Sequence, residues 1–346
     1  GNKKQVSEGL LLYTLHFCSR ELFRNTRVRV SQAYNGPLHE SAAKIFTDQE
    51  YLDSRKKLFV EPTRNIAKVV IPNLRPLDAI ALLASKSLSG NANGAGYLFY
   101  ETTKGYHFRS FENLYTKNSK TPRDIVARFD YMVRKSRDAN TEEKGKYIQD
   151  LEAVEKYEFI SNFDSAASQA MGTYANSVIT HNIYDKSYAI AKFHYHNEYN
   201  DFSHVEDSGS DDHRKFSISP SPVDYDEKTV SDYHDSNVSL VGSTAFLHNE
   251  DKGIYGIDPK LDGKTNSIQL SQNTAIANSV MVKLTVHGQS YLEAGDVIFF
   301  ALRSVESGKG VFSTGTTLDE QHSGRYIITS IRHRVVDTDY KMVLIC

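Results

Sequence analysis

The chain has 346 residues, of which 39% are hydrophobic and 24% charged, and its formal net charge is −2. This length allows two or three domains with a sizeable core. The near-neutral charge argues against a general nucleic-acid-binding protein, which usually carries a clear basic excess.

The two cysteines and the apolar runs exclude several other classes. Cys18 and Cys346 lie near opposite ends of the sequence, so no disulfide framework or Cys-x-x-Cys site can be built, and two free thiols are expected. The longest apolar runs have six residues, at 79–84 and 297–302, whereas a membrane-spanning helix needs about twenty. No secretory leader is visible at the start. Because the chain begins with Gly and ends inside an apolar strand-like run, we expect it to be a fragment.

The first part of the chain predicts alternating strands and helices. Residues 11–18 and 27–34 alternate with a period of two, which is typical of strands with one apolar face. Residues 36–52 change to helical spacing, and Pro37 suits the start of a helix. Tyr and Phe are abundant, with 21 and 17 copies, and Trp is absent; this bias favours strands and interfaces.

The next segment predicts a strand, a turn and a helix, followed by a hairpin. Within 59–88 the helix begins at Pro76. Small residues at 89–96 predict a loop. Strands at 97–101 and 106–110 then flank the turn, where Gly105 can take the positive φ that a hairpin requires.

The middle of the chain predicts helices and then strands. Residues 124–133 and 147–171 have helix-like patterns, and 172–199 returns to strand character. A long polar loop is expected from about 200 to 262. The last seventy residues predict a small antiparallel β-domain with strands at 280–288, 291–303, 324–335 and 339–346.

Two histidines near the end of the predicted middle strands raise a metal hypothesis. His194 and His196 form a His-x-His pair that a strand would place on one face, and His204 and His213 follow. Such a pair with a carboxylate can hold zinc or iron. No other strongly spaced ligand supports the site, so a strand face with two histidines is favoured and no metal is expected.

Three further patterns point to catalysis or phosphate binding only weakly. The glycine-rich loop at 90–96 lacks the Lys-Ser/Thr of a P-loop and follows a helix. Ser290 lacks the second glycine of a nucleophile elbow. Glu101, Glu112 and Asp78 could supply a carboxylate pair for glycoside hydrolysis, but sequence alone does not place them at a working distance. No catalytic or cofactor-binding residue is therefore assigned.

Residues 326–335 predict a strand with one apolar and one basic side. Its apolar side is expected to pack in a half-buried antiparallel sheet. The alternation divides the strand into two faces. One face consists of Ile327, Thr329, Ile331, His333 and Val335. The other consists of Tyr326, Ile328, Ser330, Arg332 and Arg334. The second face becomes basic toward its end, which favours a barrel wall that meets a lumen or another subunit.

The order of these segments resembles the baseplate hub proteins of contractile-tailed bacteriophages and, more loosely, the hub half of type VI secretion spike proteins. The hairpin "FYETTKGYHFRS" and the segments "LTVHGQSYLEAGDVI" and "SGRYIITSIRHRV" are the most specific matches. The similar segments are 13–21, 28–37, 70–88, 96–114, 171–188, 284–298 and 323–335.

The resemblance implies a multi-domain α+β fold, with two tube-like antiparallel β-barrel domains, an inserted α/β domain and a helical segment. The first barrel would lack its opening strands, which would precede Gly1. The implied divisions are the end of the first barrel (1–31), the α/β domain (32–120), the helical segment (121–172), return strands to the first barrel (173–200), a polar variable loop (201–262) and the second barrel (263–346).

The resemblance also implies a structural virion protein without catalytic residues, metal or cofactor. Three subunits would form a pseudo-sixfold ring that joins the tail tube to the central spike and lines the genome channel. The implied partners are two further copies of the chain, the spike, tube or tube-initiator proteins, the tape-measure protein and DNA in transit. The protein would be assembled in the host bacterial cytoplasm and reside in the tail baseplate.

Arg332 and Arg334 are the residues that we expect at a contact, either with the channel or with a neighbouring subunit, where arginine pairs well with carboxylates. The alternative reading is a tail-associated cell-wall-degrading enzyme that uses a carboxylate pair. A third is a metal-dependent binding module built on His194 and His196.

Overall fold

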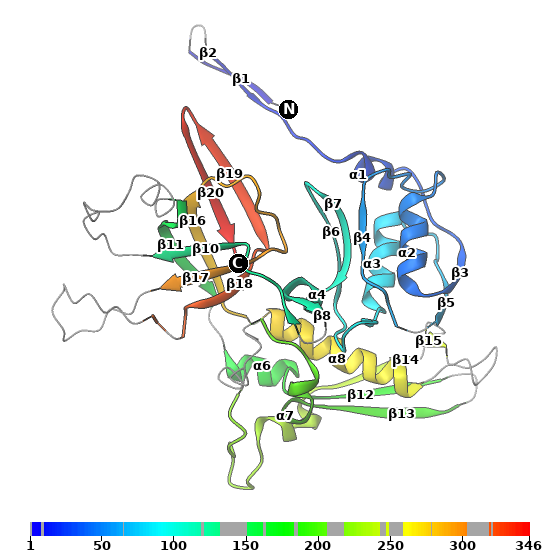
Figure 1. Ribbon diagram of the computed structural model, residues 1–346. Helices are drawn as coiled ribbons and strands as arrows, with labels where there is room; N and C mark the ends of the chain where they lie inside the picture. The colour runs from blue at the N-terminus through cyan, green and yellow to red at the C-terminus, as the bar shows by residue number, and fades with distance from the viewer. Residues whose placement is uncertain are drawn as a thin grey trace, which may run out of the picture.

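The computed structural model is a mixed α+β arrangement of several separate sheets (Figure 1). It describes residues 2–7, 10–64, 66–118, 121–131, 151–161, 164–182, 186–205, 218–242, 247–248, 259–277, 279–302, 318–319 and 321–346. Figure 1 shows an α/β region, a sheet covered by a long helix, a C-terminal group of strands, and a hairpin that projects from the rest.

The α/β region is built around two amphipathic helices. It comprises α1 (Arg20–Asn25), α2 (Leu38–Thr47), α3 (Pro76–Ser85), a sheet β15-β5-β3 (Leu247–His248, Ile66–Val70, Ala33–Gly36) and a sheet β4-β7-β6 (Leu58–Val60, Gly105–Ser110, Tyr97–Thr102). Helix α2 buries Leu38, Ala42, Ile45 and Phe46, as the helical spacing predicted. Helix α3 begins with Pro76 in its first turn, also as predicted.

The predicted hairpin is confirmed as β6 and β7. The two strands pair in antiparallel register from Tyr97 opposite Ser110 to Thr102 opposite Gly105. Gly105 has a φ of +143°, and a Cβ at this position would lie 2.4 Å from the carbonyl oxygen of Lys57. Only glycine fits there, because both the backbone conformation and the close approach exclude a side chain.

Two strand predictions near the start were too long. The strand expected at 11–18 is β2 (Leu10–Thr14), which pairs with β1 (Asn2–Ser7), and the chain becomes helical in α1 soon afterwards. In the predicted strand at 27–34, Val30 makes only an isolated bridge to Leu74 before β3 begins.

A second group of elements combines a three-stranded sheet with helix α8 (Pro259–Ala277). Strands β13 (Tyr188–His194) and β14 (Val238–Gly242) flank β12 (Ala175–His181); β13 is antiparallel to it and β14 parallel. The helix lies against β12 and β13. Short elements surround the sheet: α6 (Ser165–Met171), α7 (Tyr195–Glu198) and 3₁₀ turns at Tyr199–Asp201, Val230–Asp232 and His234–Ser236.

The C-terminal strands form two facing sheets around one core. The sheets are β11-β16-β20-β19 (Val154–Ser161, Met281–His287, Asp339–Ile345, Ser330–Val336) and β10-β17-β18 (Ala127–Tyr131, Val297–Leu302, Gly324–Ile327). Fully buried Phe129, Leu284, Phe300 and Leu344 come from both sheets. Helix α4 (Phe111–Tyr115) and the small pair β8 (Thr116–Asn118) and β9 (Thr121–Pro122) connect this group to the α/β region.

The helices predicted at 124–133 and 147–171 are mostly wrong. Residues 127–131 form β10, which pairs in parallel with β17, and 154–161 form β11; in the described part of the second range, residues 151–152 and α6 are helical. Pairing with distant strands therefore overrides the local helical pattern. Residues 132–150 lie outside the described part of the chain.

The strand predicted at 324–335 is also divided. Strand β18 belongs to one sheet and β19 to the other, and the chain crosses between them at Ile328, which is fully buried, and Thr329. Ile328 was predicted on the basic face, and the crossing explains why it lies in the core instead.

The expected barrels are not seen as closed barrels among the described strands. The segments assigned to the first barrel, β1–β2 and β12–β13, lie in separate sheets. The range 263–346 begins with most of α8, and its strands start at Met281. The described parts of the polar range 201–262 hold two 3₁₀ turns, β14, the short β15 and the start of α8, so the range is not all irregular.

Cys18 is exposed and Cys346 is buried, and both are free thiols. Burial raises the pKa of the Cys346 thiol to about 12. In the stretches that the structure describes, no helix has both the length and the apolar character that crossing a bilayer requires.

Helix α8 approaches its sheet closely at Gly263, which gives a test of this packing. A Cβ at Gly263 would lie 3.2 Å from the Cβ of Ala191 and 3.3 Å from the hydroxyl oxygen of Thr180. We expect Gly263→Leu to destabilise the fold by about 1–3 kcal/mol because it overpacks this contact. Urea unfolding monitored by circular dichroism measures the effect, and Lys264→Leu at the adjacent exposed position is the control. Equal stability of the two variants would contradict the close packing.

Candidate functional site

The outer face of the sheet β11-β16-β20-β19 carries a cluster of cations. Alternate residues of its strands point into the core, and the intervening ones point outward. The register places Arg334 opposite Lys341, and Arg332 opposite Val343. On the other side of β20, the register brings Lys283 and Lys156 to the same face. We call these five residues, Lys156, Lys283, Arg332, Arg334 and Lys341, the basic face.

Carboxylates neutralise only part of the basic face. The amino group of Lys341 lies 2.9 Å from Glu155 and 3.5 Å from Asp339. Its hydrogen bond with Glu155 raises the pKa of Lys341 above the usual value. Lys283 lies 3.2 Å from Glu158. By contrast, no ion pair joins Arg332 or Arg334 to any other residue that the structure describes, and both are exposed.

The two arginines lie on an edge strand, in the part of it that is exposed to solvent. Strand β19 has one neighbour, β20, and its residues beyond Ile331 are all exposed. The hairpin reverses at Asp337, which has a φ of +53°. Within it, the ring of His333 hydrogen-bonds the hydroxyl of Tyr340 at 2.8 Å. Val335 and Val336 are exposed close to the arginines, so the projecting end combines charge with apolar surface.

The histidine pair is not arranged as the sequence predicted. His194 ends β13, but His196 lies in helix α7, so the two do not share a strand face; their ring centroids are 6.3 Å apart. Both ring nitrogens of His196 have partners, the Ser231 hydroxyl at 2.8 Å and the Ile218 carbonyl at 3.1 Å.

Of the two other histidines of the metal hypothesis, the structure describes only His204. The ring of His204 stacks on Tyr199, while His213 lies outside the described residues. No group of three or more His, Cys, Asp or Glu in the described stretches could hold a metal ion.

The three candidate carboxylates have separate surroundings. Glu101 is paired with Lys56 and accepts a hydrogen bond from the Tyr106 hydroxyl at 2.9 Å. Glu112 is buried and accepts from the Ser203 backbone at 2.8 Å, and its burial raises its pKa. Asp78 is exposed in the first turn of α3. In the part of the chain described, no hydrogen bond links any two of these three carboxyl groups.

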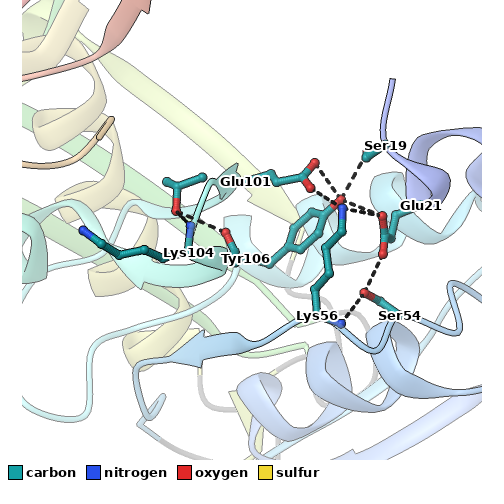
Figure 2. A network of polar contacts seen from close by, with 9 residues as sticks. Ser19, Glu21, Ser54, Lys56, Glu101, Lys104 and Tyr106 are labelled. Carbon is teal, nitrogen blue, oxygen red and sulfur yellow. Dashed lines mark hydrogen bonds and ion pairs between the residues drawn. The ribbon is translucent and has the colours of Figure 1, made fainter. Parts of the chain in front are cut away.

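A buried polar network holds helix α1 against the α/β region (Figure 2). The Glu21 carboxylate is 3% exposed and accepts hydrogen bonds from Ser54 at 2.7 Å and Lys56 at 3.0 Å. Figure 2 shows the Lys56 amino group between Glu21 and Glu101, beside the Tyr106 hydroxyl. These contacts join a helix to a loop and a hairpin that lie more than thirty residues away.

The titration of Glu21 couples this network to pH. Burial alone would raise the pKa of Glu21, but hydrogen bonds from Ser54, the backbone and Lys56 outweigh it and hold the pKa below 4.5. Because the folded-state pKa is lowered, the contribution to stability is present above about pH 4.5 and is lost as the pH falls through the folded-state pKa.

We expect Glu21→Gln to lower the free energy of unfolding by about 1–3 kcal/mol at pH 7, because a buried charged hydrogen-bond acceptor is lost. The difference from the unmodified protein should shrink as the pH falls below about 4.5. Denaturant unfolding at several pH values measures both effects. Glu50→Gln, at an exposed position, is the control. A Glu21 variant as stable as this control would contradict the role of the network.

The structure also reveals exposed apolar surfaces that sequence reasoning did not identify as sites. Tyr13, Leu15 and Phe17 precede α1 and are exposed, and so are Ile190 and Leu240 on the sheet of β12. Period-two alternation marked 11–18 as having one apolar face, but this signal does not say whether the same chain covers that face.

The chain was compared with known proteins. No protein-family model and no curated protein matches it. The solved structures that match this chain include two described as tail proteins. The 43 kDa tail protein of prophage MuSo2 from Shewanella oneidensis has 10% sequence identity and a TM-score of 0.41, over 94% of this chain and 68% of that protein. The tail protein from Neisseria meningitidis MC58 has 10% identity and a TM-score of 0.43, over 93% of this chain and 71% of that protein.

Proposed function

We propose that this chain is a structural tail component of a contractile-tailed phage: a baseplate hub subunit, three copies of which form a ring between the tail tube and the central spike. The proposal takes its starting point from the sequence resemblance in the 96–114 hairpin and in the segments 284–298 and 323–335. The last two segments supply β16 to β19, the strands that build the two-sheet C-terminal core.

The observation that carries the proposal is the basic face with its unpaired arginines. Arg332 and Arg334 are exposed beside Val335 and Val336 on an edge strand. An exposed edge strand with apolar side chains can pair with another chain, which is a disadvantage for a protein that stays monomeric. An interface core accepts arginine and apolar side chains together. We therefore assign the arginines to a contact with a neighbouring subunit rather than to the channel.

Assembly is the most direct test of this proposal. We expect light scattering to give the mass of a trimer, and negative-stain images of the same peak to show a ring with an open centre. A protein that stays monomeric at every accessible concentration would contradict the ring.

A charge reversal tests the role of the two arginines. Arg332→Glu combined with Arg334→Glu should weaken trimer formation about tenfold or more, because it sets like charges against the carboxylates expected on the neighbour. Sedimentation at a series of concentrations measures the shift. Lys44→Glu combined with Arg75→Glu changes the net charge equally at exposed positions elsewhere and serves as the control. If both double variants assemble normally, the arginines do not form the contact.

A further inference from the structure

The chain that leads into the α/β region, here called the arm, has an exposed apolar side, which continues on the outer side of helix α1. Five large side chains between residues 13 and 23 are exposed, and Phe17 reaches 88%. Figure 1 shows the chain before α1 and the hairpin β1–β2 extending away from the other elements, whereas α1 lies beside the α/β region. The exposed large side chains of the arm are Tyr13, Leu15, Phe17, Leu22 and Phe23.

The arm is followed by unpaired positive charge. Arg20 and Arg24 are held by Asp53, at 2.6 Å and 3.8 Å. Arg27 and Arg29, which come next, are exposed, and neither has an ion pair with another described residue. We define the arm as residues 13–29; it presents an apolar stretch and two exposed arginines, of which Arg27 lies over the Phe23 ring at 5.9 Å.

A second apolar surface lies on the sheet β13-β12-β14. Helix α8 packs on one face of this sheet, where Gly263 meets Thr180 and Ala191. On the opposite face, the strand registers align Ile190, Ile179 and Leu240 in one row across the three strands. Ile190 and Leu240 are exposed, and so are their neighbours Tyr188 and Val238. We call these five side chains the open sheet face.

The chain that leads into the open sheet face is acidic. Asp226, Glu227 and Asp235 are exposed in the segment before β14, and Lys228 is the one cation within 218–237. Tyr225 in the same segment is fully exposed. This segment carries an excess of negative charge, opposite in sign to the arginines of the arm, although Lys228 lies 3.7 Å from Asp226. The open sheet face itself carries one exposed cation, Lys192, which lies opposite Ser177 on the same side as Ile190.

We propose that the arm of one copy of this chain docks on the open sheet face of a second copy. Both surfaces are apolar, and the acidic segment that leads into β14 complements the arginines of the arm; such charge complementarity favours a specific encounter. They cannot meet within one chain, because the arm and β12–β14 lie at opposite ends of the molecule (Figure 1). The contact is head to tail, and contacts of this type close into rings when the rotation between copies permits.

The size of the two surfaces fits this assignment. Aromatic side chains bury about 150–250 Å² each at interfaces. Three of the five arm side chains are aromatic and one of the five on the sheet, so the apolar side chains supply the centre of a contact whose ~800 Å² per partner must be completed by the neighbouring polar residues. The inference rests on the proposed function only where it takes the assembly to be a closed ring. The docking itself is argued from the arm and the open sheet face alone.

Complementary variants test the docking directly. The arm variant combines Leu15→Asp with Phe17→Asp, and the sheet variant combines Ile190→Asp with Leu240→Asp. Each variant alone should be monomeric at concentrations where the unmodified protein assembles. An equimolar mixture should give a dimer and nothing larger, because one intact arm and one intact sheet face remain. Light scattering measures the masses, and circular dichroism checks that each variant is folded.

Matched controls and charge variants sharpen the result. Val70→Asp combined with Ile125→Asp replaces exposed apolar residues outside both surfaces and should assemble normally. Arg27→Glu combined with Arg29→Glu should weaken assembly about tenfold, and mixing this variant with Asp226→Lys/Glu227→Lys should restore part of the loss. Added salt should weaken the unmodified assembly, since it screens exposed charges.

The outcomes separate this inference from the proposed function. If the unmodified protein forms a trimeric ring and the arm and sheet variants do so too, the docking is wrong and the hub proposal stands. If the protein forms open chains that both variants disrupt, the docking is right and the closed ring is wrong. Variants that are monomeric alone and remain monomeric when mixed would show that the arm binds elsewhere.

Discussion

The arrangement of this chain depends on helix α8, a mostly polar helix that is engaged on two sides. On one side it packs against β12 and β13, where Ile268 joins Phe193 in a small core. On the other it contacts the α/β region: the Gln272 side chain accepts a hydrogen bond from the Ala95 backbone at 2.8 Å, and that of Gln269 donates to the Ser85 carbonyl. A helix that is polar around its circumference is stable when it bridges two bodies in this way.

The bridging is achieved with short polar side chains. Ser267 and Ser271 are buried in α8, and the Ser271 hydroxyl donates to the Thr173 carbonyl at 2.7 Å. The Asn176 amide donates to the Ser267 carbonyl at 3.2 Å. Because these donor and acceptor pairs are satisfied, their burial does not carry the cost of an unsatisfied polar atom; the buried Asn176 Oδ1, by contrast, has no partner among the described residues. A helix of larger apolar residues could not approach the sheet as closely as Gly263 does.

The C-terminal sheets are fixed to the same framework by polar contacts at the hairpin of β6 and β7. Glu293 pairs with Lys104 at 3.3 Å and accepts a hydrogen bond from the Thr103 hydroxyl. Next to it, Leu114 and Val297 pack in a shared cluster. Helix α1, the open sheet face and the basic face therefore belong to elements joined by direct contacts, so the fold sets their spacing on the surface, whereas the chain before α1 extends away from them.

The sequence predicts those parts of the fold that depend on interactions between residues close together in the chain, and it misses those that depend on distant residues. Helices α2 and α3 and the hairpin at Gly105 were predicted because their signals are local: an apolar stripe, a proline at a helix start, and a glycine at a turn. Strand β10 was taken for a helix, since its pairing with β17 spans about 170 residues and leaves no local trace. Helix α8 has no apolar stripe by which to recognise it.

An alternating pattern of apolar residues predicts the exposed surfaces of this chain only in part. Alternation correctly separated Arg332 and Arg334 from the core side of their strand, because each strand has two faces and only one can pack on the core. The same pattern in Tyr13, Leu15 and Phe17 predicts that a face will be buried, but not by which chain. In this structure the core sides of β16 and β20 are covered from within, whereas the arm is not. Sequence periodicity thus identifies surfaces that require a partner, and the fold then shows which of them the chain leaves open.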